Sequence, residues 1–98
     1  MPTHNEDERF VKDYDALTPE EKRLFRLAVK KLVEDLDRSG PIRGSLRVMP
    51  MQGYPGVWEM TWEGLDGRAT FEYGAERKPG KKHIRWRRVG DHRIFDNP

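Results

Sequence analysis

Residues 18–41 read TPEEKRLFRLAVKKLVEDLDRSGP and decide the fold of this 98-residue chain. Thr18 followed by Glu21 is the capping-box pattern that starts a helix, and Pro19 stands at the first helical position, where proline fits best. Apolar residues then recur at helical spacing, at Leu24, Phe25, Ala28, Val29, Leu32, Val33 and Leu36. Ser39, Gly40 and Pro41 end the pattern. The stretch therefore predicts one long amphipathic helix.

After residue 41 the apolar period changes from 3.6 to 2, which is typical of strands. The predicted strands cover residues 45–51, 57–63, 68–73 and 83–89. The connections are predicted to be a turn at 52–56, a tight hairpin at 64–67 and a flexible basic loop at 74–82. Helices first and hairpin-linked strands second predict an α+β fold.

The strand faces predict where the core lies. Trp58, Met60 and Trp62 share one face, as do Ile84 and Trp86. We expect these side chains to pack on the long helix rather than to stack on bases. A short first helix is predicted over residues 8–17, and residues 1–6 are predicted to be a disordered terminus. The expected architecture is two N-terminal helices on a twisted, antiparallel, four-stranded meander sheet, forming one domain over residues 1–98.

Composition excludes several classes of protein. The chain has no cysteine, so disulfides, thiolate metal sites and thiol chemistry are excluded. Its first residues are polar and no apolar run is long enough to span a bilayer, so we expect a cytoplasmic protein with no membrane partner. His4, His83 and His92 are scattered without ligand spacing, which predicts no metal site. No phosphate-binding loop is present, and we expect no cofactor of any kind.

Charge is distributed unevenly along the chain. Residues 77–93 contain eight basic residues and one acidic residue, Asp91. Such clustering favours an anionic partner, although it is also compatible with an ordinary solvated charged face.

Arginines on the predicted strands are the candidates for chemistry. Outward residues on adjacent strands stand about 5 Å apart, so Arg68 and Arg87 are expected to line one concave surface. Clustered arginines hold phosphates and stabilise transition-state charge, and His92 can transfer protons near neutral pH. This combination suits a metal-independent ribonuclease that uses the RNA 2′-hydroxyl as nucleophile. The alternative is that the arginines form surface ion pairs with nearby acids, namely Glu59, Glu63, Glu72 and Asp91.

Three segments resemble the RelE/ParE family of bacterial toxin–antitoxin toxins. They are VWEMTW at residues 57–62, GRATFEY at 67–73 and HIRWRRVGDHRIF at 83–95. The similarity extends over roughly residues 8–96 and includes the long helix. It implies a helix packed on a twisted antiparallel sheet, and a toxin that is neutralised by a cognate acidic antitoxin.

The resemblance also implies residue roles. Arg68 matches a sheet arginine that contacts phosphate in ribonuclease members, and His92 falls where members carry arginine or histidine. Phe95 stands where several members carry a catalytic tyrosine, so that role is lost here or passes to His92 or Tyr73.

The leading hypothesis is a toxin that cleaves mRNA on the ribosome and so inhibits translation. Its predicted catalytic residues are Arg68, His92 and Arg87. Its predicted RNA-binding residues are Arg47, Lys81, Lys82, Arg85 and Arg88. One alternative is a non-catalytic binder of the same fold, either a gyrase-directed toxin or a degenerate member that binds antitoxin or nucleic acid. A third possibility is a housekeeping protein without toxicity.

Overall fold

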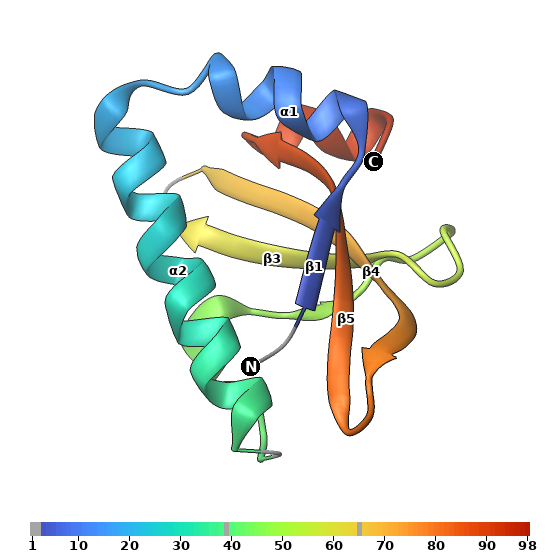
Figure 1. Ribbon diagram of the computed structural model, residues 1–98. Coiled ribbons are helices and arrows are strands. Elements are labelled where there is room, and N and C mark those ends of the chain that lie inside the picture. Colours follow the sequence, from blue (N-terminus) through green and yellow to red (C-terminus); the bar gives the residue numbers. More distant parts are fainter. Residues whose placement is uncertain (1–2, 39, 65) are drawn as a thin grey trace.

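The computed structural model describes residues 3–38, 40–64 and 66–98. Two α-helices and a five-stranded mixed sheet form an α+β fold, in which α2 runs along the sheet and α1 crosses near one end of it (Figure 1). The elements in chain order are β1 (Thr3–Glu6), α1 (Glu8–Asp15), α2 (Pro19–Asp37), the 3-10 helix η1 (Gly44–Leu46), β2 (Met49–Pro50), β3 (Trp58–Glu63), β4 (Gly67–Lys78), β5 (Lys81–Gly90) and the 3-10 helix η2 (His92–Asp96).

The long helix begins as its sequence predicts. The Glu21 backbone N–H donates to Thr18 Oγ1 at 3.1 Å, and the Thr18 backbone N–H donates to Glu21 Oε1 at 2.9 Å. These two bonds satisfy donors that a helix start leaves unpaired. The helix ends with Arg38 as its C-cap. Ser39, which was expected to help end it, lies outside the described residues.

The predicted four-stranded meander is wrong, because the sheet has five strands in the order β1-β5-β4-β3-β2. The extra strand comes from residues 3–6, which were expected to be disordered and instead pair in parallel with β5. The pairing is reinforced by His83 Nε2, which lies 2.7 Å from Asn5 Oδ1. His83 is consequently buried, although alternation had placed it on the outer face. Residues 1 and 2 lie outside the described part of the chain.

Two further segments differ from prediction. Residues 45–51 were expected to form a full strand, but they contain the end of η1 and only the two-residue β2. Arg47 follows η1 with φ 47°, a left-handed conformation that interrupts an extended chain, and Pro50 has no N–H for strand pairing. Residues 74–82 were expected to be a loop, but β4 and β5 extend into them and turn at Gly80, where φ is 76°. In the shorter hairpin at 64–67, Leu65 lies outside the described residues.

A β-bulge in β5 determines which side chains face the core. Thr70 pairs with Arg88 while Phe71 pairs with Trp86, so Arg87 is an additional residue on the β5 side. Trp86 and Val89 are therefore both buried although they stand three residues apart. The bulge also leaves Arg87 and Arg88 adjacent on the partly exposed side of the strand.

The core lies between α2, α1 and the inner face of the sheet, as the strand faces predicted. Leu32, Met60 and Phe71 are completely buried. Phe25 packs against Trp86 and Trp62, with ring centroids 5.3 Å and 6.1 Å away. Trp62 and Trp86 are thus core residues, as expected, whereas Trp58 is only partly buried and packs against the core. None of the described helices has the length and apolar character that a membrane crossing requires.

Candidate functional site

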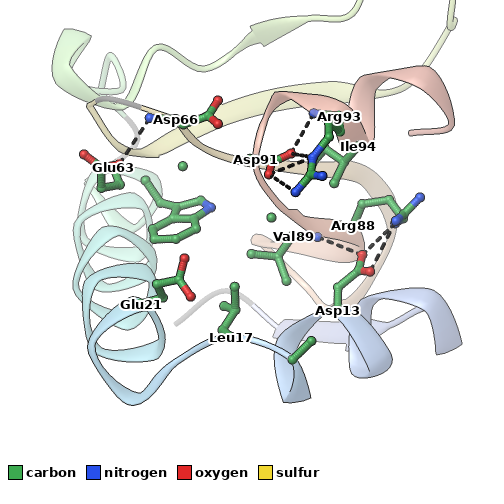
Figure 2. A pocket seen from close by; sticks show the side chains of 14 residues that line it. Asp13, Leu17, Glu21, Glu63, Asp66, Arg88, Val89, Asp91, Arg93 and Ile94 are labelled. Atoms are coloured by element: carbon green, nitrogen blue, oxygen red, sulfur yellow. Dashed lines mark hydrogen bonds and ion pairs between the residues drawn. The ribbon is translucent and has the colours of Figure 1, made fainter.

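A polar pocket of about 590 Å³ lies where the α1–α2 junction faces the β3–β4 hairpin, the end of β5 and the start of η2 (Figure 2). Acidic side chains outnumber basic ones in its wall. They are Asp13, Glu21, Glu63, Asp66 and Asp91. Its two arginines are both paired with acids, since Arg88 contacts Asp13 and Arg93 contacts Asp91. The interior of this pocket is therefore not a phosphate site, and the candidate chemistry lies at its rim.

His92 is fixed at this rim by the β3–β4 hairpin. Its Nδ1 lies 2.8 Å from Asp66 Oδ1, and its backbone N–H donates to the same oxygen at 3.2 Å. The hydrogen bond from His92 lowers the pKa of Asp66, so this carboxylate stays charged at neutral pH. When Nδ1 carries the proton, Asp66 holds the ring as the tautomer whose exposed Nε2 can accept a proton.

Arg68 is held by the same hairpin. Its Nη1 donates to the backbone oxygens of Glu63 at 3.2 Å and Gly67 at 3.0 Å. The Arg68 backbone oxygen accepts from Trp62 Nε1 at 2.8 Å, which ties this part of β4 to the core. Among the described residues, Arg68 has no carboxylate within ion-pair distance. Its guanidinium therefore keeps a positive charge that is not neutralised directly.

Other acids near the site were not predicted as functional. Asp91 caps η2 by accepting from the Arg93 backbone N–H, and its ion pair with Arg93 lowers the pKa of Asp91 to about 2. One ligand atom each from Asp66, Asp91 and His92 lies within 4.8 Å of the others. Both carboxylates already accept hydrogen bonds, so we interpret the group as a hydrogen-bonded cluster. Asp66 was overlooked because Asp-Gly is a turn signal in its own right.

Glu59, which the sequence analysis named only as an ion-pair partner for an arginine, also lies near Arg68. It lies on β3 opposite Thr70, and partial burial raises the pKa of its carboxyl while the charge of Arg68 opposes that effect. Glu59 and Arg68 lie on the neighbouring strands β3 and β4, which explains why the charge of Arg68 affects the pKa of Glu59. The alternation of side chains along β3 places Glu59 on the face opposite Trp58 and Met60. The sequence alone did not show that Glu59 is partly buried there.

The remaining predicted arginines of the sheet each lie beside an acidic residue. Arg85 contacts Glu72 at 3.0 Å and Asp7 at 3.3 Å. Arg87 contacts Glu72 at 3.2 Å and Arg88 contacts Asp13 at 2.6 Å. These three arginines thus form the ion pairs that the sequence analysis gave as the alternative. Of their partners only Glu72 was among the expected acids, and Asp7 and Asp13 were not. Arg87 does not stand beside Arg68, because Gly90 pairs with Arg68.

The other predicted RNA-binding residues lie apart from His92. Arg47 is exposed after η1. Lys81 and Lys82 are at the β4–β5 turn, which is at the opposite end of these strands from the Arg68–Gly90 pair. The Lys82 ammonium lies 5.2 Å from the ring centroid of Tyr73. These residues do not form one compact surface with His92.

Tyr73, one of the two residues to which the missing tyrosine role could pass, is not well placed to take it over. Tyr73 packs edge-on against Phe71 and Trp58, and burial raises the pKa of its hydroxyl. Phe95 is partly buried in η2 and has no hydroxyl. His92 is therefore the better placed of the candidate proton-transfer groups.

A second hollow is chemically different. This groove of about 620 Å³ lies between α2, α1 and the edge strand β1. Its lining is mainly aromatic and aliphatic, with Phe10, Tyr14, Phe25, Val29, Val33, Ile84 and Trp86. The polar lining residues besides Tyr14 are Arg26 and Lys30 of α2 and Glu6 and His4 of β1, so basic residues outnumber the one acid. The groove is suited to an apolar segment that also carries negative charge.

The structure is a small α+β domain in which a helical layer packs on a mixed sheet. No protein-family model matches the chain, and no curated protein matches it. Solved structures do match it along nearly its whole length.

Toxins and toxin–antitoxin complexes are among the matching structures. A mutant of YafQ from E. coli has a TM-score of 0.68 at 16% identity, covering 97% of this chain and 98% of that one. The YoeB/ParE toxin from Agrobacterium tumefaciens has a TM-score of 0.65 at 14% identity, covering 92% and 98%. The RelB–RelE antitoxin–toxin complex from Methanococcus jannaschii gives a TM-score of 0.55 at 20% identity, covering 95% and 98%. The chain thus has a RelE/ParE-like fold, as the resemblance implied.

Proposed function

We propose that the protein is the toxin of a type II toxin–antitoxin pair and acts in the cytoplasm as a ribosome-dependent mRNA endoribonuclease. The observation that carries this proposal is that one hairpin holds both groups: Arg68 belongs to β4, and His92, the first residue of η2, contacts Asp66 of the β3–β4 turn. A proton-transfer group and an arginine without a carboxylate partner, among the described residues, lie on a fold shared with toxins.

The proposed chemistry uses groups of this chain, the RNA and solvent water. His92 Nε2 takes the proton of the 2′-hydroxyl, whose oxygen attacks the adjacent phosphorus. The bond from phosphorus to the 5′-oxygen breaks as that oxygen takes a proton from water, which leaves a 2′,3′-cyclic phosphate and a 5′-hydroxyl. Negative charge increases on the non-bridging oxygens as the new bond forms, and the guanidinium of Arg68 stabilises it. Asp66 stabilises the imidazolium that His92 becomes, in the way a carboxylate supports the histidine of a hydrolase triad.

Growth of cells after induced expression of the protein tests whether it is toxic. The effect of a substitution at His92 on that growth tests the site. The parent should arrest growth, whereas a folded His92→Gln variant should not, since glutamine cannot transfer a proton near pH 7. Glu20→Gln is a matched control, because Glu20 is an exposed residue of α2 that contacts only Arg23 among the interactions described. Normal growth with the folded parent protein would reject the toxin proposal.

The proposed partner is a cognate acidic antitoxin. The arginines of the sheet are one possible interface for it, but Arg85, Arg87 and Arg88 are already paired with acids, so the groove beside α2 is the better candidate. An amphipathic segment would bury its apolar face on Phe25 and Trp86 and place acidic side chains near Arg26. Hydrogen exchange with the bound partner should protect α1, α2 and β1, whereas protection confined to β4 and β5 would return the interface to the sheet.

The second candidate is a non-catalytic toxin of the same fold, such as one directed at gyrase. Phe95 favours it, because a hydroxyl is lacking where ribonuclease members of the resembling family carry tyrosine. Blocked gyrase supercoiling with intact RNA would support this candidate over the endoribonuclease.

A further inference from the structure

The hairpin that carries Arg68 contains a β-bulge at Trp62. Thr61 pairs with Arg68 across the two strands. The next pair joins Glu63 to Gly67, so Trp62 is an additional residue on the β3 side. The Trp62 ring is buried in the core, and its Nε1 donates to the Arg68 backbone oxygen at 2.8 Å. The bulge therefore lets a core side chain hold the backbone of Arg68.

Gly67 lies directly against this bulge. A Cβ atom at residue 67 would stand 2.5 Å from Glu63 Cβ, 2.7 Å from the Glu63 backbone nitrogen and 2.7 Å from Trp62 Cδ2. Carbon atoms pack at about 3.5 Å or more, so a side chain here would displace its neighbours by about 1 Å. Neither neighbour yields easily, because one is strand backbone and the other is the ring of a core residue. At Gly64, in the same turn, no described atom lies within 4 Å of such a Cβ.

The backbone of the hairpin also orients the Arg68 guanidinium. Its Nη1 donates to the backbone oxygens of Glu63 and Gly67, and these are the only hydrogen bonds of the Arg68 side chain among the described residues. Nε and Nη2 thus remain for a ligand. These two nitrogens form an edge with which an arginine can bind two phosphate oxygens at once.

We propose that Trp62 and Gly67 are positioning residues for Arg68. The close contact between the Trp62 ring and Gly67 fixes the strand from which Arg68 extends, and so fixes the Nε–Nη2 edge toward the scissile phosphate. This inference rests on the proposed function, in which Arg68 stabilises the charge that develops on that phosphate. Trp62 and Gly67 act through Arg68 and do not themselves touch the RNA.

A methyl group added at Gly67 tests the proposal. Gly67→Ala should lower the single-turnover cleavage rate on the order of 10²-fold, which is the effect of a misplacement of about 1 Å at a reacting centre. It should lower the affinity for a 2′-O-methyl RNA oligonucleotide much less, and this probe cannot be cleaved because it has no 2′-hydroxyl. Gly64→Ala is the matched control, since the same substitution in the same turn meets open space, and its rate should equal the parent's.

Removal of the Trp62 hydrogen bond is a milder test of the same contact. Trp62→Phe keeps an aromatic ring in the core but has no N–H for the Arg68 backbone oxygen. The cleavage rate should fall by about two- to tenfold, the factor that corresponds to the net contribution of one hydrogen bond. Trp58→Phe on the same strand is the control, because Trp58 pairs with Phe71 and not with Arg68. Its rate should equal the parent's.

A double variant shows whether Gly67 acts through Arg68. In a chain that already carries Arg68→Ala, Gly67→Ala should cause no further loss of rate. A further loss of full size would mean that Gly67 acts on Asp66 and His92 instead, and would overturn the proposal. Equal rates in folded Gly67→Ala and Gly64→Ala would also overturn it. If circular dichroism shows that Gly67→Ala is unfolded, Trp62→Phe with and without Arg68→Ala decides in the same way.

The mobility of Arg68 in the RNA-free protein separates this proposal from the proposed function. The NMR order parameter of the Arg68 Nε–H group should be high in the parent and in Gly64→Ala, and lower in Gly67→Ala and Trp62→Phe. This pattern in a protein that cleaves no message would keep the two residues as the support of Arg68 and reject the endoribonuclease. Cleavage by the parent, with equal rates and equal Arg68 mobility in all variants, would keep the endoribonuclease and reject the positioning role.

Discussion

His92 Nδ1 lies 2.8 Å from Asp66 Oδ1, and this contact joins the start of η2 to the β3–β4 hairpin. The two residues are far apart in sequence, yet Asp66 accepts from both the ring and the backbone of His92. A carboxylate that fixes a histidine in this way determines its tautomer and stabilises its protonated form. The pair is therefore the most specific structural support for a proton-transfer role of His92.

Replacement of either member of this pair should reduce RNA cleavage. His92→Gln should lose on the order of 10²–10⁴ in rate, which is the usual contribution of general acid–base catalysis. Asp66→Asn should lose less, because an amide oxygen still accepts a hydrogen bond but carries no charge to stabilise the imidazolium. Single-turnover cleavage rates measure both, with folding checked by circular dichroism. Parent-like rates in both folded variants would remove His92 from the mechanism.

Arg68→Ala should reduce the cleavage rate far more than the affinity for RNA. One charge-assisted contact that strengthens in the transition state is worth on the order of 10²–10³ in rate. Lys81→Ala and Lys82→Ala are useful comparisons, because these lysines lie at the distant β4–β5 turn. They should weaken binding modestly and flatten its salt dependence without a comparable effect on the chemical step. An equal loss of affinity and rate in Arg68→Ala would assign Arg68 to binding only.

Leu32→Ala should destabilise the fold by about 2–5 kcal/mol, because it removes a completely buried side chain and leaves a cavity. Leu27→Ala on the same helix is the matched control, since Leu27 is 44% exposed. It should cost much less. The free energy of unfolding from chemical denaturation measures the difference. A loss below about 0.5 kcal/mol for Leu32→Ala would contradict the packing of α2, since that is the effect of a surface substitution.

Asp35 should make the fold sensitive to acid. Hydrogen bonds from the Arg43 side chain and backbone, with a further bond from Arg38, hold the pKa of Asp35 well below its usual value of 3.8. Because the folded pKa is depressed, this contribution to stability is present above pH 3.8 and is lost as pH falls below it. Asp35→Asn should be less stable than the parent at pH 7, and its stability should fall less steeply below pH 4. Identical pH slopes in parent and variant would contradict this role of Asp35.

Local patterns predicted the helical half of the fold well. The capping box at Thr18 and the apolar spacing through Leu32 are short-range signals, and the structure has the helix where they place it. The sheet was predicted less completely, because β1 is stabilised by distant partners. Nothing within residues 3–6 shows that Asn5 will bond to His83. The bulge at Arg87 is likewise visible only when β4 and β5 are aligned.

The candidate site was predicted in part for the same reason. Arg68 and His92 were identified from their residue types and from the family resemblance. In the structure Arg68 belongs to β4, and His92, the first residue of η2, contacts the β3–β4 hairpin through Asp66. Asp66 was read as a turn residue, although it holds His92. The pairing of Arg85 with Asp7 also depends on the unexpected strand β1, so the sequence could not show how many arginines are already neutralised.

We propose that this chain cleaves mRNA on the ribosome, and mapping of message ends in a reconstituted translation system tests this activity most directly. Added protein should halt elongation and produce new message ends at the ribosomal A site. The cuts should appear only when ribosomes are present and should be lost with folded His92→Gln. Intact message beside normally elongating ribosomes, with the folded parent protein in excess, would contradict the claim.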